Sequence, residues 1–130
     1  MTTGLSPTTA NSLLNAICRA SAYSAPAVYV QLHIADPGAA GTANLATETT
    51  RKAVTFGNAA SGGSIANTVA VTWTNINAPT PQDASHYSLW DAASAGTFLG
   101  SGLITANQYS GGDTYNMAVG AVVLSFGVAA

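Results

Sequence analysis

The residues of this chain that could do chemistry are few, and its two histidines are the first to consider. His33 and His86 each lie in a strand-like pattern, on the face opposite the large apolar residues. A metal site would need both to converge with carboxylates such as Asp36, Asp83 or Asp91, as in known transition-metal sites. We expect instead that both histidines are solvated or lie at an interface, and we predict no metal site.

Asp83, Ser85 and His86 supply the residue types of a nucleophilic triad. They crowd into one short stretch, which argues against the geometry of a working triad, and no Gly-x-Ser-x-Gly motif is present. Asp36 precedes a Pro-Gly pair and Asp113 follows a Gly-Gly pair, so we interpret both as turn residues rather than calcium ligands. The sequence therefore predicts no catalytic residue and no cofactor.

The remaining distinctive side chains offer contacts rather than catalysis. Cys18 is the single cysteine, and we interpret it as a small buried side chain on a helix. Trp73 follows an apolar strand face and is expected in the core. Trp90 lies opposite Leu89 and is the candidate for an exposed ring that could stack on sugars. Tyrosines are candidates for subunit interfaces, where aromatic residues are enriched: Tyr23, Tyr29, Tyr109 and Tyr115.

Charge is scarce in this chain. Of its 130 residues, 6% are charged, against roughly a quarter in an ordinary soluble domain. The formal net charge is −2, and the three cations Arg19, Arg51 and Lys52 cannot neutralise a run of phosphates, so we expect no nucleic-acid binding. A surface of Thr, Ser, Asn, Gly and Ala is desolvated at little cost. Such a surface favours packing among copies of the chain, or against a larger assembly, over catalysis.

The N-terminal segment predicts a helix over residues 7–20. Ser6 is a good N-cap, Pro7 suits the first helical position, and apolar residues recur at helical spacing. This stripe has two interpretations, packing on its own β domain or packing on a neighbouring subunit or larger scaffold. We expect no signal peptide and no membrane-spanning segment. The stripe consists of Ala10, Leu13, Leu14, Ile17 and Ala20.

The rest of the chain has the pattern of β structure, with turns at Gly and Pro residues. Strands are expected over residues 28–34, around Val54 and Phe56, over 65–74, 86–90 and 98–105, and in a closing hairpin of 114–119 and 121–128. The inner faces of the first and third are expected to carry Val28, Val30, Leu32 and Ile34, and Ile65, Val69, Val71 and Trp73. We predict a mainly β protein. It comprises an N-terminal arm and helix over residues 1–26 and a single β-sandwich or jelly-roll-like domain over residues 27–130.

Several loop sequences are distinctive. They read LHIADPGAAGTAN over residues 32–44, RKAVTF over 51–56, HYSLWDAA over 86–93, FLGSGL over 98–103 and GGDT over 111–114. Together these segments resemble a family of small bacteriophage virion surface proteins, often labelled phage tail fibre proteins and in part similar to head-decoration or head-fibre proteins. The resemblance covers most of residues 28–128, and it brings no catalytic residues with it.

The resemblance implies a structural protein of the phage particle surface, made in the host cytoplasm, and not an enzyme. Our leading hypothesis is a head-decoration protein that binds the assembled shell through the major capsid protein or another virion protein. The alternative is a tail-fibre or tail-tip protein that contacts host surface glycans. We expect a homo-oligomer, with a trimer as the working guess. The candidate interface residues are Leu13, Leu14, Ile17, Trp90 and Tyr29.

Overall fold

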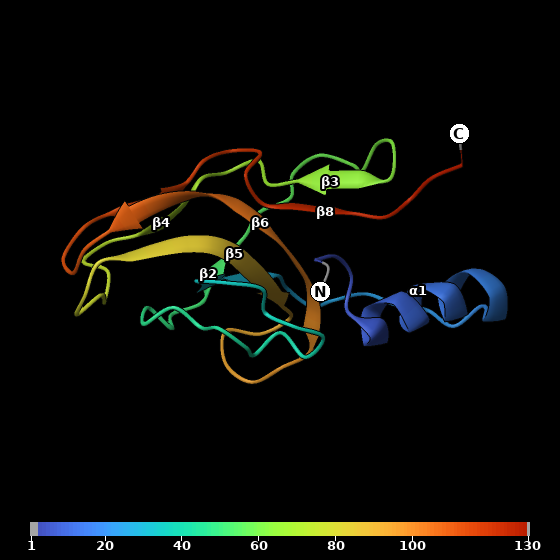
Figure 1. The fold of residues 1–130 in the computed structure, drawn as a ribbon. Helices are drawn as coiled ribbons and strands as arrows, with labels where there is room; N and C mark the ends of the chain where they lie inside the picture. The colour runs from blue at the N-terminus through green and yellow to red at the C-terminus, as the bar shows by residue number, and fades with distance from the viewer. Residues whose placement is uncertain (1–2, 130) are drawn as a thin grey trace.

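The computed structural model describes residues 3–129, in which one N-terminal helix precedes a mainly β domain (Figure 1). Helix α1 spans Pro7–Arg19. The strands are β1 (Tyr29–His33), β2 (Lys52–Ala53), β3 (Ser64–Ala66), β4 (Val71–Trp73), β5 (Gln82–Trp90), β6 (Phe98–Tyr109), β7 (Tyr115–Met117) and β8 (Val123–Ser125). Between residues 3 and 129, no helix has the length and apolar character needed to cross a membrane. The prediction of a mainly β, sandwich-like protein with an N-terminal helix is confirmed.

The strands form one four-stranded antiparallel sheet and two short antiparallel ladders. The sheet has the order β2-β1-β5-β6, while β3 pairs with β8 and β4 pairs with β7. One hydrophobic core joins the sheet to both ladders, since Leu32 and Tyr87 of the sheet cluster with Trp73 and Met117 of the β4–β7 ladder and with Val122 beside β8. The core therefore lies between two β layers.

The alternating pattern of β1 and β5 places one face of each strand in this core. Val30 and Leu32 of β1 are 0% exposed, and Tyr87 and Leu89 of β5 are 1% exposed. Val30 and Leu32 confirm the predicted inner face of the first strand, because side chains two residues apart share one side of a strand. Ile34 was expected in the same row but is 43% exposed, because β1 ends before it.

The predicted closing hairpin is wrong, since β7 and β8 belong to different ladders. Gly120 does turn the chain, with a φ of 83°. The buried side chain of Asn67 lies at this turn: its Oδ1 accepts from the Val122 amide at 2.9 Å, and its Nδ2 donates to the Ala118 carbonyl at 3.1 Å. These bonds occupy backbone groups that flank the turn, and the chain passes from one ladder to the other.

The predicted strand over residues 65–74 is divided into β3 and β4. Asn67 again accounts for the break, because its Nδ2 also donates to the Val69 carbonyl at 2.8 Å and holds the chain in a bend. Val69, expected in the core, is 55% exposed. The predicted strand around Val54 and Phe56 is likewise displaced, since β2 covers only Lys52–Ala53.

Residues 4–6 attach the helix to the edge of the sheet. The Ser6 amide donates to the Leu99 carbonyl at 2.9 Å, and the Ser101 amide donates to the Gly4 carbonyl at 2.7 Å. This short pairing runs along β6, after which α1 projects beyond the sheet (Figure 1). The helix therefore starts at a fixed point but extends away from the four-stranded sheet, the β4–β7 ladder and their connecting loops, which we call the β body.

Candidate interaction surface

Local hydrogen bonds define both ends of helix α1. The Ser6 Oγ accepts from the Thr9 amide at 3.1 Å and also contacts the Phe98 carbonyl of β6 at 2.6 Å, so the N-cap ties the helix to the sheet. At the other end, Ala20 has a left-handed φ of 51°, and the Ser21 amide donates to the Asn15 carbonyl at 3.3 Å. The helix predicted over residues 7–20 is confirmed to within one residue.

The apolar stripe of α1 is only partly covered. Leu13 is half-buried, but Leu14 is 58% exposed and Ile17 is 80% exposed. Thr9 is the buried residue of the helix, and it lies in the turn nearest to β6. The protein's own β domain therefore covers the beginning of the stripe and leaves the rest open.

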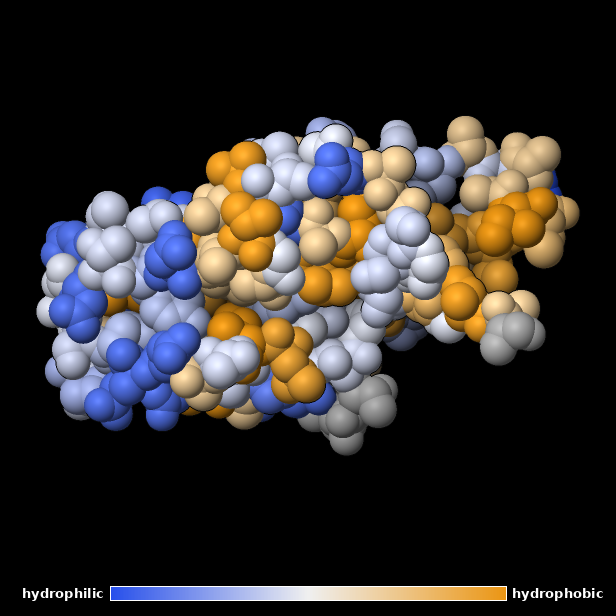
Figure 2. Space-filling model, turned by 90° about the horizontal axis from the view of Figure 1, so that it is seen from above, coloured by the Kyte–Doolittle hydropathy of each residue, from blue (hydrophilic) through white to orange (hydrophobic). Residues whose placement is uncertain are grey.

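Phe126, after β8, lies beside this stripe, and Val128 lies next to Gly63. Phe126 is 61% exposed, Val128 is 58% exposed, and Tyr23 after the helix is 38% exposed. The Phe126 amide donates to the Gly63 carbonyl at 3.0 Å, which extends the β3–β8 ladder toward the helix. We call α1 with residues 20–28, 60–65 and 124–128 the helical end. Figure 2 shows apolar residues gathered toward this end and polar residues at the opposite end of the molecule.

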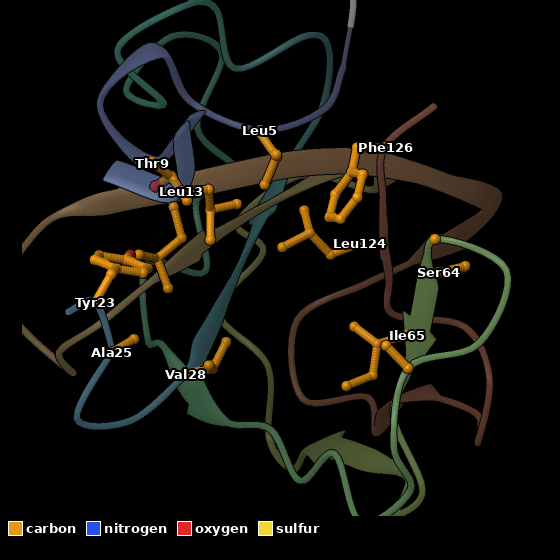
Figure 3. Close-up of a pocket in the computed structure, with 13 residues that line it drawn as sticks. Leu5, Thr9, Leu13, Tyr23, Ala25, Val28, Ser64, Ile65, Leu124 and Phe126 are labelled. Carbon is orange, nitrogen blue, oxygen red and sulfur yellow. The ribbon is translucent and has the colours of Figure 1, made fainter. Parts of the chain in front are cut away.

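Two adjoining hollows mark the helical end. One, of about 230 Å³, lies between the helix, the segment after it and the β3–β8 ladder (Figure 3). The second, of about 240 Å³, runs along the stripe of α1. Apolar side chains dominate both linings: Leu5, Leu13, Val28, Ile65, Leu124 and Phe126 in the first, and Leu5, Leu13, Leu14, Ile17 and Phe126 in the second.

The helical end is almost free of charge. Among its residues, Arg19 is the one charged side chain, and there is no Lys, Asp or Glu. Cys18, expected to be buried, is exposed. The expectation is wrong because the last turn of α1 lies beyond the β body, so within residues 3–129 no segment packs against the face that carries Cys18. The arrangement offers apolar contact area rather than acid–base chemistry.

Trp90 and Tyr29 lie elsewhere, as partners across β5 and β1. Trp90 is 7% exposed, so the expectation of an exposed ring is wrong. The Arg51 guanidinium covers the ring at 3.9 Å from its centroid, and Phe98 packs at 5.4 Å. Of the five candidate interface residues, the structure brings Leu13, Leu14 and Ile17 together and places Trp90 and a half-buried Tyr29 on the sheet.

Two of the tyrosines proposed for interfaces are core residues instead. Tyr109 is 3% exposed and Tyr115 is 6% exposed, and their rings meet at 5.1 Å. Tyr115 also packs on Trp73, at 6.0 Å, and Trp73 is in the core as predicted. Burial, with Tyr109 and Asp83 nearby, raises the pKa of Tyr115 to about 12, so its phenol stays protonated.

Ser85 and His86 touch, but not as a nucleophile and its base. The Ser85 Oγ lies 2.9 Å from the Ile34 carbonyl, which can only accept, and 2.8 Å from the His86 Nδ1. The single hydroxyl hydrogen therefore goes to the carbonyl, and His86 donates to the serine. Asp83 is exposed, and within residues 3–129 no group of three His, Cys, Asp or Glu side chains could hold a metal.

The aspartates act in turns, as predicted. Asp36 Oδ1 accepts from the Gly38 amide at 2.7 Å, and Asp113 Oδ2 accepts from the Ser110 amide at 2.8 Å. His33, expected to be solvated or at an interface, is instead 0% exposed. The expectation is wrong because residues 43–46 run along the edge of β1 and bring the Ala43 carbonyl to the His33 ring.

Sequence reasoning missed Phe126 and Val128 as surface residues, because a closing hairpin would have placed part of that stretch in the core. The signal that could have found them is their position after the last core strand. Apolar residues that follow the last core strand have few neighbours to cover them.

One family model matches residues 4–125 of the chain, and its description is Podophage GP4 fiber I protein gp80. The match spans both α1 and the β domain. No curated protein is similar to the chain at a significant level.

Proposed function

We propose that this chain, which belongs to the podophage GP4 fiber I protein gp80 family and is therefore a structural protein of the phage virion, is a fibre subunit whose copies meet at the helical end. The observation that supports the proposal is the exposed stripe of α1 beside the exposed C-terminal residues. A lone chain would leave this surface in water, where apolar area is costly to expose.

The size of the surface fits an interface core. Leu14, Ile17, Tyr23, Phe126 and Val128 together present on the order of 400 Å² of apolar area, since a large aromatic side chain alone contributes ~150–250 Å² when covered. A typical monomer has its largest patch at roughly 300–600 Å². A standard interface buries about 800 Å² per partner around an apolar centre. The helical end would supply that centre.

The charge distribution favours a second copy of this chain as the occupant. The helical end carries only Arg19, whereas all five carboxylates and the other two cations belong to the β body. The end of the molecule opposite α1 is polar (Figure 2). A copy can therefore cover the apolar surface with its own helical end but not with its opposite end. This favours a closed cyclic arrangement, in which each copy uses the same region.

A matched pair of glutamate substitutions tests the assembly. Ile17→Glu places a carboxylate on the open stripe, and Val69→Glu places one on an exposed apolar position of the β body. We expect Ile17→Glu to weaken association ~100-fold or more, because burying an unpaired charge costs several kcal/mol. Light scattering during size-exclusion chromatography over a concentration series measures this. Unchanged association of the Ile17→Glu chain would overturn the role of the helical end.

The position on the particle is tested separately, by electron microscopy of intact phage labelled with an antibody against this chain. We expect label on slender projections. Label spread over the head shell would favour the decoration role instead. The carbohydrate-contact alternative has lost its main candidate, because the Trp90 ring is covered by Arg51.

A further inference from the structure

Residues 43–51 run along the edge of β1, where Leu45 forms an antiparallel bridge with His33, and we call these residues the strap. The first part of the strap pairs with the end of β1. The Ile34 amide donates to the Asn44 carbonyl at 2.9 Å, and the Ala46 amide donates to the Leu32 carbonyl at 3.2 Å. This pairing, with the Ala43 carbonyl next to it, accounts for the burial of the His33 side chain.

His33 is the central contact between the sheet and the strap. Its Nδ1 lies 2.7 Å from the Ala43 carbonyl of the strap, and its Nε2 lies 2.7 Å from the Ser88 Oγ on β5. The Trp90 Nε1 lies 2.8 Å from the same Ser88 Oγ. His33 and Ser88 are both 0% exposed, so water cannot replace these bonds.

The partners determine where the hydrogens lie. A carbonyl can only accept, so the Nδ1 of His33 carries a hydrogen and donates it to Ala43. An indole Nε1 can only donate, so the Ser88 Oγ accepts from Trp90. The hydroxyl hydrogen of Ser88 then points to the Nε2 of His33, which accepts it. The ring is therefore neutral, and the bonds run in one direction from Trp90 through Ser88 and His33 to the strap.

A second proton on the His33 ring would disrupt this chain of hydrogen bonds. The Nε2 would then point a hydrogen at Ser88, whose own hydrogen would lose its acceptor in a buried place. The ionisable groups that act on the ring are His86 of β5 and Arg51 of the strap, and neither is a carboxylate. Burial lowers the pKa of the His33 ring. The nearby His86 and Arg51 lower this pKa further, and the hydrogen bond to the Ala43 carbonyl offsets the shift in part.

The nearby carboxylates are already engaged. Asp36 accepts from an amide of its own turn. Glu48, in the strap, accepts from the Thr50 amide and from the Asn77 amide, each at 2.9 Å. Burial acts to raise the pKa of Glu48, but the bonds from Thr50 and Asn77 outweigh it and lower the pKa, so Glu48 stays ionised where histidine titrates.

We propose that the contact between His33 and the Ala43 carbonyl is an acid-sensitive latch, which releases residues 43–46 from the sheet while Glu48 keeps the other part of the strap attached. This latch is independent of the fibre role. In the released state the ring of His33 reaches water and takes up a proton. The released state therefore gains population as the pH falls.

Linkage gives the expected size of the effect. The folded-state pKa of His33 is below its ordinary value of about 6.5, so the closed strap is fully stabilised above that pH and loses stability as the pH falls below it. If the released ring has an ordinary pKa and the closed ring stays neutral, the opening equilibrium should rise by up to about tenfold between pH 7.5 and pH 5.5.

Amide hydrogen exchange of the unmodified protein, followed by NMR and corrected for the intrinsic effect of pH, measures this opening. We expect the protection of the Ala46 and Ile34 amides to fall between pH 7.5 and pH 5.5, by up to about tenfold. The Thr50 amide, bonded to Glu48, should keep its protection. Unchanged protection of Ala46 over this range would overturn the latch.

Two substitutions identify the responsible ring. His33→Asn keeps a donor near the Ala43 carbonyl but cannot take up a proton, so the acid response should vanish. His86→Asn removes the neighbouring half-buried histidine and should leave the response intact. A response that survives His33→Asn, or that is lost in His86→Asn, would also overturn the latch. If the His33→Asn variant does not fold, an NMR titration of the two histidine rings in the unmodified protein provides the test. The titration of the His33 ring should follow the loss of protection at the Ala46 amide.

Discussion

The β body and the helical end are both rich in apolar side chains, but only one of them covers those side chains. In the body, Trp73 and Leu89 are each 1% exposed. At the helical end, Ile17 and Phe126 are 80% and 61% exposed, although they are as apolar as the core residues. Composition therefore does not distinguish the core from an interaction surface. What distinguishes them is whether a second layer of the same chain lies opposite.

The two regions are also held by different forces. The body is held by packing between two β layers, which is cooperative and involves many residues. Within the helical end, helix α1 is held by an N-cap, a short backbone pairing along β6 and a few half-buried side chains. Regions with few buried apolar contacts open more readily than the core. The effects of substitutions on stability should therefore differ between the two regions, both in size and in which part of the chain they affect.

The largest effect is expected from Trp73→Ala. The change empties a large volume in the core and leaves the Thr50 carbonyl without the indole donor it has at 2.9 Å. We expect a loss of about 3–5 kcal/mol in the free energy of unfolding, measured by urea denaturation. Ile17→Ala at the helical end is the control and should stay within about 0.5 kcal/mol for the monomer. Equal losses would show that the helical end is packed as tightly as the body.

A smaller effect is expected from Gly102→Ala on β6. A Cβ at Gly102 would overlap the phenol of Tyr87, which is fixed in the core by its bonds with Val123. We expect a loss of about 1–3 kcal/mol. Gly127→Ala is the matched control, since a Cβ there meets no atom within 4 Å. Thermal unfolding of the two variants measures the difference, and a stable Gly102→Ala chain would mean that Tyr87 can move.

The smallest effect is expected from Ser6→Ala, which removes the N-cap of α1 and its contact with the Phe98 carbonyl. We expect about 1 kcal/mol of lost stability, concentrated in the helix. Hydrogen exchange of α1 amides should increase while exchange in β5 does not change. If both regions exchange faster together, the helix and the body unfold as one unit, and the contrast between them is wrong.

Several features were predictable because their causes are local. Ser6 and Pro7 define the start of α1, and Asp36 and Asp113 cap turns through their own side chains. The inner faces of β1 and β5 follow from alternation. Strand pairing was not predictable in the same way. The separation of β7 from β8 depends on the buried Asn67, whose bonds to Ala118 and Val122 cross more than 50 positions of the chain.

The candidate interface was predictable only in part. Leu13, Leu14 and Ile17 follow from helical spacing, but spacing does not show whether a helix face is covered by its own chain. Trp90 illustrates the opposite case, since alternation places it on an outer face, and only the tertiary structure brings Arg51 over its ring.

The sequence by itself determined the scarcity of charge, the helix and the β character of the rest, because these depend on residue type and on neighbours within a few positions. Only the tertiary structure decided that His33 and Trp90 are buried and that Ile17 and Phe126 are exposed. The physical reason is that burial depends on which distant segment lies opposite a side chain. The strap brings the Ala43 carbonyl to His33 and the Arg51 guanidinium to Trp90, whereas residues 3–129 leave the far turns of α1 exposed.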